Sequence, residues 1–271
     1  DNLEELILDE VPDTIAAFLA APVTGASGVI VPPEGYYEKV QTILDKYGIL
    51  FIADEVITAF GRTGDDFGCT TMDIRPDMMT LAKQLSSAYF PISAAVLPGW
   101  MHEAMVEPSA KVGAFGHGYT YSGHPVACAA ALKTLEIYER DGLYQNAREM
   151  GQHLQARLAE LSAIEAVGEV RGADLIGAVE LVEDRDSRTP AIDLAKRATQ
   201  ACQDNGLIVR NVAGNALAVC PPLIITEEQI DEAIEILDKA LKIGDEEAVE
   251  SALGEVGLDL VQGAQDRKSV V

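Results

Sequence analysis

The stretch Ile49-Leu50-Phe51-Ile52-Ala53-Asp54 decides how this chain is expected to fold, because an apolar run of strand length ends there on a carboxylate. A second apolar run, Met78-Met79-Thr80-Leu81-Ala82, ends on Lys83. Short apolar runs of this kind are typical of buried strands. The first run follows a predicted strand at residues 14–20 and a predicted helix that ends at Gly48, so we expect a parallel strand–helix–strand unit. In an open parallel sheet, the side chains that follow neighbouring strands meet at one crevice.

Asp54 and Lys83 are therefore expected to lie near one another, as an acid and an amine at one edge of the sheet. An amine can form an imine with a carbonyl cofactor, and a carboxylate can keep a ring nitrogen protonated so that the ring attracts electrons. Each residue also has an ordinary interpretation, the first as a helix-capping or loop carboxylate and the second as a solvated loop lysine. The local pattern leaves both interpretations open.

The rest of the chain is predicted to change character near residue 150. Pro32-Pro33 is expected to open the helix that ends before Gly48, and two helices are expected between residues 125 and 161. The elements predicted elsewhere are strands at 78–82, 94–97, 207–212 and 216–220, a hairpin of 167–172 with 175–181, and helices at 2–10, 192–205 and 227–242. We interpret residues 1–150 as part of a large α/β domain, 151–243 as a smaller α+β domain, and 244–271 as an acidic and polar tail.

The charge balance excludes several classes of partner. The chain has 271 residues, with 44 acidic and 20 basic residues and a formal net charge of −24. This argues against binding nucleic acid or an anionic membrane, since both need clusters of Lys and Arg. A soluble acidic surface and adaptation to a saline habitat both fit this composition. No apolar run approaches the roughly 20 residues of a membrane span, and no leader peptide is recognised, so a cytoplasmic protein is expected.

The cysteines and histidines do not have the spacing of a metal site or a disulfide framework. There are four of each, with no Cys-x-x-Cys pair and no His-x-x-x-His pair. These residues are Cys69, Cys128, Cys202, Cys220, His102, His117, His124 and His153. We expect isolated thiols in a reducing compartment and no bound metal.

Two further segments carry groups that suit anions. Gly118-Tyr119-Thr120-Tyr121-Ser122-Gly123-His124-Pro125 places hydroxyl groups before a predicted helix, where a phosphate can bind. An aromatic-rich loop with capping hydroxyls is the alternative. Arg210 closes the run Leu207-Ile208-Val209 and could grip a substrate carboxylate with paired donors, or it could be a plain surface arginine.

Together these motifs resemble the class III aminotransferases, which are pyridoxal-phosphate enzymes of fold type I. The resemblance covers roughly residues 3–240. Its motifs are Ala53-Asp54-Glu55-Val56, Phe60-Gly61-Arg62-Thr63-Gly64, Ala82-Lys83 and the segment from Gly118 to Ala127. The most similar subgroup is the ω-amino acid or amine:pyruvate transaminases, on Lys83-Gln84-Leu85-Ser86-Ser87, Gly206-Leu207-Ile208-Val209-Arg210 and Cys220-Pro221-Pro222-Leu223-Ile224-Ile225-Thr226.

The resemblance implies a role for each candidate residue. Lys83 would form the imine with pyridoxal phosphate and shuttle the proton, Asp54 would bind the pyridine nitrogen, and Val56 would pack on one ring face. Thr120, with Tyr119 beside it, would reach the phosphate of the partner subunit across a homodimer interface. Arg210 would match the mobile arginine that binds the substrate carboxylate.

The implied reaction moves an amino group from an ω-amine or ω-amino acid to a keto acid such as pyruvate. Another class III activity, such as a decarboxylating transaminase or an aminomutase, is the alternative enzyme. A truncated chain with no activity of its own is the alternative without catalysis.

Two departures from the family pattern bear on these expectations. The family usually has Glu-Pro-Val where this chain has Ala21-Pro22-Val23, and Ala21 counts against ornithine- and γ-aminobutyrate-type substrates. The N-terminal part of the family, with its glycine- and serine-rich phosphate cup, has no counterpart here, because the chain begins at Asp1 in the middle of the expected large domain. We therefore interpret the chain as a C-terminal fragment or an incomplete reading frame.

Overall fold

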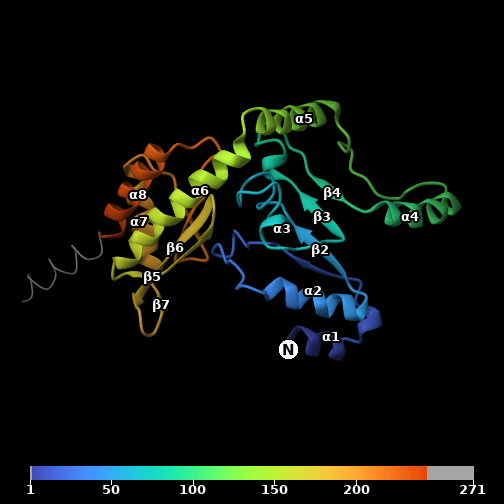
Figure 1. The fold of residues 1–271 in the computed structure, drawn as a ribbon, viewed down its shortest axis with the longest axis horizontal. Helices are drawn as coiled ribbons and strands as arrows, with labels where there is room; N and C mark the ends of the chain where they lie inside the picture. The colour runs from blue at the N-terminus through green and yellow to red at the C-terminus, as the bar shows by residue number, and fades with distance from the viewer. Residues whose placement is uncertain (1, 243–271) are drawn as a thin grey trace, which may run out of the picture.

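Two separate β-sheets, one mainly parallel and one antiparallel, organise the residues 2–242 that the computed structural model describes (Figure 1). The first sheet has the strand order β1-β2-β3-β4, and the second has the order β5-β6-β9-β8 with the short β7 paired to β6. A mainly parallel sheet followed by α+β structure agrees with the predicted fold class. The predicted tail at 244–271 lies outside the described residues.

The first sheet places the two key strands side by side. Strands β1 (Ala17–Ala20), β2 (Leu50–Asp54) and β3 (Met78–Leu81) are parallel, whereas β4 (Ala94–Val96) runs antiparallel to β3. Asp54, at the end of β2, lies opposite Thr80 in β3. The carboxyl ends of β2 and β3 therefore lie at the same edge of the sheet, as the sequence predicted.

The helices packed on this sheet agree with the sequence except at one end. Helix α1 (Asn2–Asp9) packs with α2 (Tyr36–Tyr47), and Gly48 ends α2 in the left-handed conformation with φ of 65°. The expectation that Pro32-Pro33 opens α2 is wrong. The helix begins only after Gly35, whose φ of 73° is readily adopted by glycine and redirects the chain into the helix.

Helix α4 (Gly99–Val112) was not predicted from the sequence. None of its residues is buried, and Pro108 lies inside it. A helix without a buried face lacks the 3.6-residue apolar period that reveals helices in a sequence. Figure 1 shows α4 projecting away from the body of the structure. The short helix α3 (Gly68–Thr71) was also missed.

The second half of the described chain contains the predicted hairpin and helices. Strands β5 and β6 pair in antiparallel fashion, and β8 is shorter than predicted because it begins only at Arg210. Residue 150 falls inside the continuous helix α6, so the change from parallel to antiparallel sheet occurs across that helix. The bounds are α5 (Pro125–Arg140), α6 (Leu143–Glu160), β5 (Val167–Ala173), β6 (Ile176–Asp184), β7 (Thr189–Pro190), α7 (Ile192–Asp204), β8 (Arg210–Val212), β9 (Ala216–Val219) and α8 (Glu227–Leu241).

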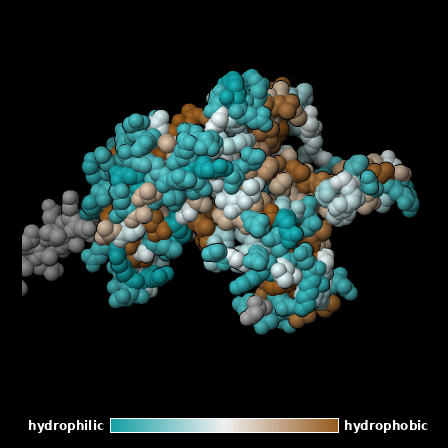
Figure 2. Space-filling view, in the orientation of Figure 1, coloured by the Kyte–Doolittle hydropathy of each residue, from teal (hydrophilic) through white to brown (hydrophobic). Residues whose placement is uncertain are grey.

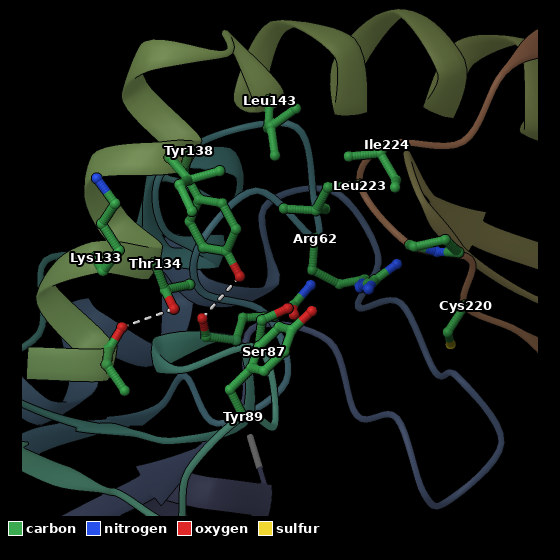
Figure 3. A pocket seen from close by; sticks show the side chains of 14 residues that line it. Arg62, Ser87, Tyr89, Lys133, Thr134, Tyr138, Leu143, Cys220, Leu223 and Ile224 are labelled. Carbon is green, nitrogen blue, oxygen red and sulfur yellow. Dashed lines mark hydrogen bonds between the residues drawn. The ribbon is translucent and has the colours of Figure 1, made fainter. Parts of the chain in front are cut away.

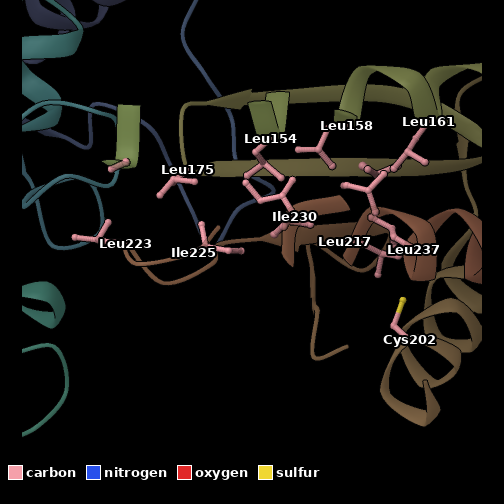
Figure 4. Packing of buried hydrophobic residues seen from close by; sticks show 14 of the residues in the cluster. Leu154, Leu158, Leu161, Leu175, Cys202, Leu217, Leu223, Ile225, Ile230 and Leu237 are labelled. Carbon is pink, nitrogen blue, oxygen red and sulfur yellow. The ribbon is translucent and has the colours of Figure 1, made fainter. Parts of the chain in front are cut away.

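A leucine-rich core lies between helices α6–α8 and the second sheet (Figure 4). Leu154 and Leu158 of α6 and Leu217 of β9 are almost fully buried there. The same cluster reaches the first sheet through Phe60 and Leu81, so the two halves share buried contacts. Figure 2 shows hydrophilic residues dominating the face over the second half, whereas hydrophobic residues gather around α5 and the first sheet.

Candidate active site

Asp54 is held by two hydrogen bonds at the carboxyl end of β2. Its Oδ1 accepts from the backbone N–H of Val56 at 3.1 Å and from the hydroxyl of Thr80 at 3.3 Å. Because both bonds found within residues 2–242 use the same oxygen, Oδ2 stays available to a ligand. A carboxylate with a fixed orientation and one open oxygen is suited to accept a hydrogen bond from a protonated ring nitrogen.

Lys83 directly follows the end of β3 in an unusual backbone conformation. It opens a one-turn 3₁₀ helix (Lys83–Leu85) with φ of 43°, in the left-handed region that residues other than glycine seldom adopt. Backbone strain of this kind clusters at functional sites, where the surrounding fold maintains it. Lys83 thereby lies at the sheet edge that also carries Asp54, and both residues line the same cavity.

A cavity of about 220 Å³ brings together three of the predicted site residues. Asp54, Val56 and Lys83 line it on the side of the sheet. The remaining lining residues are Ile57 and the loop residues Ala21, Val23, Thr24, Gly25, Ala26 and Ser27. The cavity thus combines one carboxylate, one amine, three branched apolar side chains and a wall of mostly small residues.

The loop at residues 21–30 forms the small-residue wall. Thr24 and Ile30 hold the loop closed through two backbone hydrogen bonds of 3.1 and 2.9 Å. A Cβ atom at Gly25 would lie 2.6 Å from Cδ1 of Ile57, so only glycine allows the loop to approach Ile57 this closely. The sequence indicated a small-residue loop here but not that it faces Asp54 and Lys83.

Glu55 anchors the segment that follows Asp54, which the sequence did not reveal. Its side chain is fully buried. Its carboxyl oxygens accept hydrogen bonds from the Thr58 hydroxyl at 2.5 Å, the Gly68 N–H at 3.0 Å and the Cys69 N–H at 2.6 Å. Burial, and then the charge of Glu55, raises the pKa of the Cys69 thiol. These contacts tie the end of β2 to the start of α3. The only signal in the sequence was that Glu55 stands next to Asp54.

Tyr119 and Thr120 lie outside the cavity. Both are in an exposed loop before α5, and the Tyr119 side chain is 79% exposed. The N–H of Tyr119 donates to Oγ of Ser122 at 3.0 Å, and Nδ1 of His124 accepts from the Val126 N–H at the start of α5. Their role at the phosphate of a second subunit stays a prediction.

Arg210 is also not among the residues that line the cavity. It is exposed at the start of β8, where it pairs with Ala218 of β9. The β8–β9 hairpin nevertheless touches the wall of the cavity, because Val23 and Val29 share a buried cluster with Val212 and Ala218. The structure therefore brings the strand of Arg210, but not its side chain, to the candidate site.

A larger cavity of about 760 Å³ lies beside α5 (Figure 3). Several of its polar groups already have partners: Lys133 pairs with Glu136 at 2.6 Å, and the hydroxyls of Thr134 and Tyr138 donate to backbone carbonyls at 2.9 Å. The groups that suit cofactor chemistry lie in the smaller cavity, so volume alone does not identify the site.

Residues 2–242 contain neither a metal-ligand cluster nor a helix suited to span a membrane. No group of three or more His, Cys, Asp or Glu side chains gathers there in a way that could hold a metal ion. No helix in that part of the chain has the length and apolar character needed to cross a membrane.

Comparisons with known proteins cover almost the whole described chain. A family model described as aminotransferase class-III matches residues 1–241. The "uncharacterized aminotransferase y4uB" of Sinorhizobium fredii is 46% identical over 246 residues, which are 89% of this chain and 53% of that protein. "Gamma aminobutyrate transaminase 1, mitochondrial" of Solanum lycopersicum is 46% identical over 244 residues, which are 89% of this chain and 47% of that protein.

Solved structures give a similar result. The structure of the ω transaminase from Pseudomonas jessenii in complex with PMP superimposes with a TM-score of 0.86 at 48% identity, over 89% of this chain and 53% of that chain. The chain spans about half the length of the curated relatives that it matches.

Proposed function

Because this chain belongs to the class III aminotransferase family, we propose that it carries the catalytic lysine and aspartate of a pyridoxal-phosphate-dependent transaminase. The proposed reaction moves an amino group from an ω-amine or ω-amino acid to a keto acid such as pyruvate. The observation that carries the proposal is the cavity shared by Asp54 and Lys83 at the ends of two adjacent parallel strands. Relatives named as ω-transaminases and γ-aminobutyrate transaminases support it.

The residues of the cavity fit pyridoxal phosphate. Lys83 would attach the cofactor through Nζ, Asp54 would bind its ring nitrogen through the open Oδ2, and Val56 would pack on the ring. When bound, the cofactor supplies a ring that takes up electrons from the carbon bearing the amino group. In our proposal, Thr120 and Tyr119 of a second subunit contact the phosphate, and the working unit is a cytoplasmic homodimer.

The two charged side chains would perform different parts of the chemistry. Asp54 would hold the ring-nitrogen proton in place, since the Val56 N–H and the Thr80 hydroxyl fix the orientation of its carboxylate. Lys83 would serve as the amine that holds the cofactor and as the base that takes a proton from the amino-bearing carbon of the substrate and returns it during transfer.

Substrate choice would depend on Arg210 and Ala21. An arginine can bind the carboxylate of pyruvate or of an ω-amino acid through two parallel hydrogen bonds. Ala21 lines the cavity where ornithine- and γ-aminobutyrate-type members of the family have a glutamate. We therefore expect simple ω-amines to be better donors than ornithine or γ-aminobutyrate.

A second proposal concerns the 271-residue chain by itself, which we expect to lack turnover. Strands β1 and β4 are the edges of the first sheet, and Leu19 and Val96 on them are 60% and 42% exposed. Exposed apolar edge strands favour self-association. The chain also matches only about half of each relative, and its Thr120 would need a partner subunit.

The test is alanine formation from pyruvate and an ω-amine, measured in the natural protein that carries this chain. Lys83→Ala should abolish turnover, because nucleophile and proton carrier are lost together. Lys111→Ala is the matched control, since Lys111 is exposed on α4 and pairs only with Glu107 among the described residues. Comparable rates for the two variants would overturn the proposed role of Lys83. Turnover by the 271-residue chain alone would overturn the second proposal only.

A further inference from the structure

Arg62 is a buried arginine that links the two sheets. Its side chain is 8% exposed, and its Nη1 donates to the carbonyl oxygens of Leu175 at 2.8 Å and Pro221 at 2.6 Å. The ion pairs found within residues 2–242 give it no carboxylate partner. A buried guanidinium group is tolerated only where its donors are bonded, so these two carbonyls fix its position.

The two carbonyls belong to segments that flank strands of the second sheet, whereas Arg62 belongs to the first half. Leu175 lies in the turn between β5 and β6, and Pro221 lies just beyond the end of β9. Arg62 is in the loop that follows Asp54, whose start is fixed by the buried Glu55. In Figure 3 the side chain of Arg62 extends toward the segment that carries Cys220 and Leu223.

Strand β9 of the β8–β9 hairpin is also anchored by its pairing with β6, whereas β8 pairs only with β9 within the sheet. Strand β8 is a three-residue edge strand, and Oδ1 of Asn211 is buried in it without a hydrogen-bond partner within the described residues. The turn of the hairpin packs on the loop that walls the candidate site, since a Cβ atom at Gly28 would lie 3.6 Å from Cβ of Ala213. At the end of the hairpin away from its turn, Arg210 lies across from Ala218. Near that end, the hydrogen bond from Arg62 to Pro221 holds the segment just beyond β9.

We propose that Arg62 is a positioning residue that holds the β8–β9 hairpin, and with it Arg210, against the loop that walls the cavity of Asp54 and Lys83. This rests on the proposed function as far as the substrate carboxylate is concerned. The hydrogen bonds of Arg62 to Leu175 and Pro221 are present in this chain and do not depend on the proposed function. In this proposal Arg62 acts through the segment just beyond β9, the strand that pairs with the Arg210 strand β8.

Hydrogen exchange of the 271-residue chain tests whether Arg62 holds the β8–β9 hairpin in place. Arg62→Met keeps a long side chain but removes both donors, so amide exchange at residues 210–212 and 216–219 should accelerate about tenfold or more, while β2 and β3 stay unchanged. Arg148→Met is the matched control. Arg148 also ties α6 to the same loop, through Asp65 at 2.6 Å, but it does not touch the hairpin. Unchanged exchange in β8 and β9, or equal acceleration in both sheets, would overturn the proposal.

If Arg62→Met does not fold, Arg62→Lys, which keeps the charge and can reach one carbonyl, should give a smaller acceleration confined to the same residues.

Steady-state kinetics of the natural protein test the link to Arg210. Arg62→Met should raise KM for pyruvate about tenfold with a much smaller change in kcat, and the double variant with Arg210→Ala should be no worse than Arg210→Ala alone. Additive losses would show that Arg62 does not act through Arg210 and would overturn that link. If Arg210→Ala itself leaves KM unchanged, the substrate role of Arg210 fails, and the exchange result decides whether Arg62 positions the hairpin.

Discussion

Replacing Glu55 by glutamine should destabilise the chain although the change keeps the shape of the side chain. Glu55 is fully buried, and its two carboxylate oxygens accept hydrogen bonds from three donors. In one orientation, the amide nitrogen of Gln faces the Cys69 N–H. In the other it faces the Gly68 N–H. Either way a donor opposes a donor, and one backbone N–H at the start of α3 loses its partner.

The expected magnitude follows from that unpaired group. A buried N–H without a partner costs about 1–3 kcal/mol, and the lost hydrogen bond adds about 1 kcal/mol. We therefore expect Glu55→Gln to lower the free energy of unfolding by about 2–4 kcal/mol, through a lower midpoint in urea with an unchanged slope. The exchange of amides at the start of α3 should accelerate as well.

The control is Glu34→Gln, which makes the same chemical change at an exposed position before α2. It should stay within about 0.5 kcal/mol of the parent, as is usual for surface substitutions. A Glu55→Gln variant as stable as the Glu34→Gln variant would refute the reasoning that Glu55 fixes the segment between Asp54 and α3.

Three further predictions concern the core, the half-buried Asp174 and the candidate site. Leu158→Ala should lower the free energy of unfolding, measured by urea denaturation, by about 2–5 kcal/mol, because Leu158 is 0% exposed in the main core. A loss under about 1 kcal/mol would contradict that packing. Burial, and then the charge of Asp65, raises the pKa of Asp174. Asp174 therefore destabilises the folded state above its raised pKa, and this penalty disappears as the pH falls through that value toward the ordinary one. Asp174→Asn should stabilise the chain at pH 7, and the gain should shrink as the pH is lowered in thermal melts, whereas a gain independent of pH would contradict the cause. Asp54→Asn should change the free energy of unfolding by less than about 1 kcal/mol, because an amide oxygen can keep both bonds made by Oδ1. The same variant should slow the half-reaction of the natural protein by several orders of magnitude. A near-normal rate would make Asp54 a structural carboxylate.

The sequence predicted the elements whose patterns are local. The apolar runs before Asp54 and Lys83 are the parallel strands β2 and β3. The parallel pairing of β1 with β2 follows from helix α2 between them, because parallel neighbours need a crossover connection. The resemblance to class III aminotransferases is confirmed by the family match over residues 1–241. Helix α4 escaped because it buries no residue and so shows no amphipathic period.

The contacts that the sequence could not reveal join residues far apart in the chain. Arg62 bonds to Leu175 and Pro221, which lie 113 and 159 positions away. Glu55 bonds to backbone N–H groups 13 and 14 positions away, and any residue type can supply such groups. The sequence named Asp54 and Lys83 because their chemistry follows strand ends, but it could not show which loop would form the opposite wall of their cavity.

Reductive labelling tests the central claim most directly. The protein is incubated with pyridoxal phosphate, reduced with borohydride and digested, and the labelled lysine is identified by mass spectrometry. The cavity of Asp54 and Lys83 predicts that the label lies on Lys83 and disappears in Lys83→Ala. Recovery of the label mainly on Lys46 or Lys111, with Lys83 unmodified, would contradict the assignment of this cavity as the cofactor site.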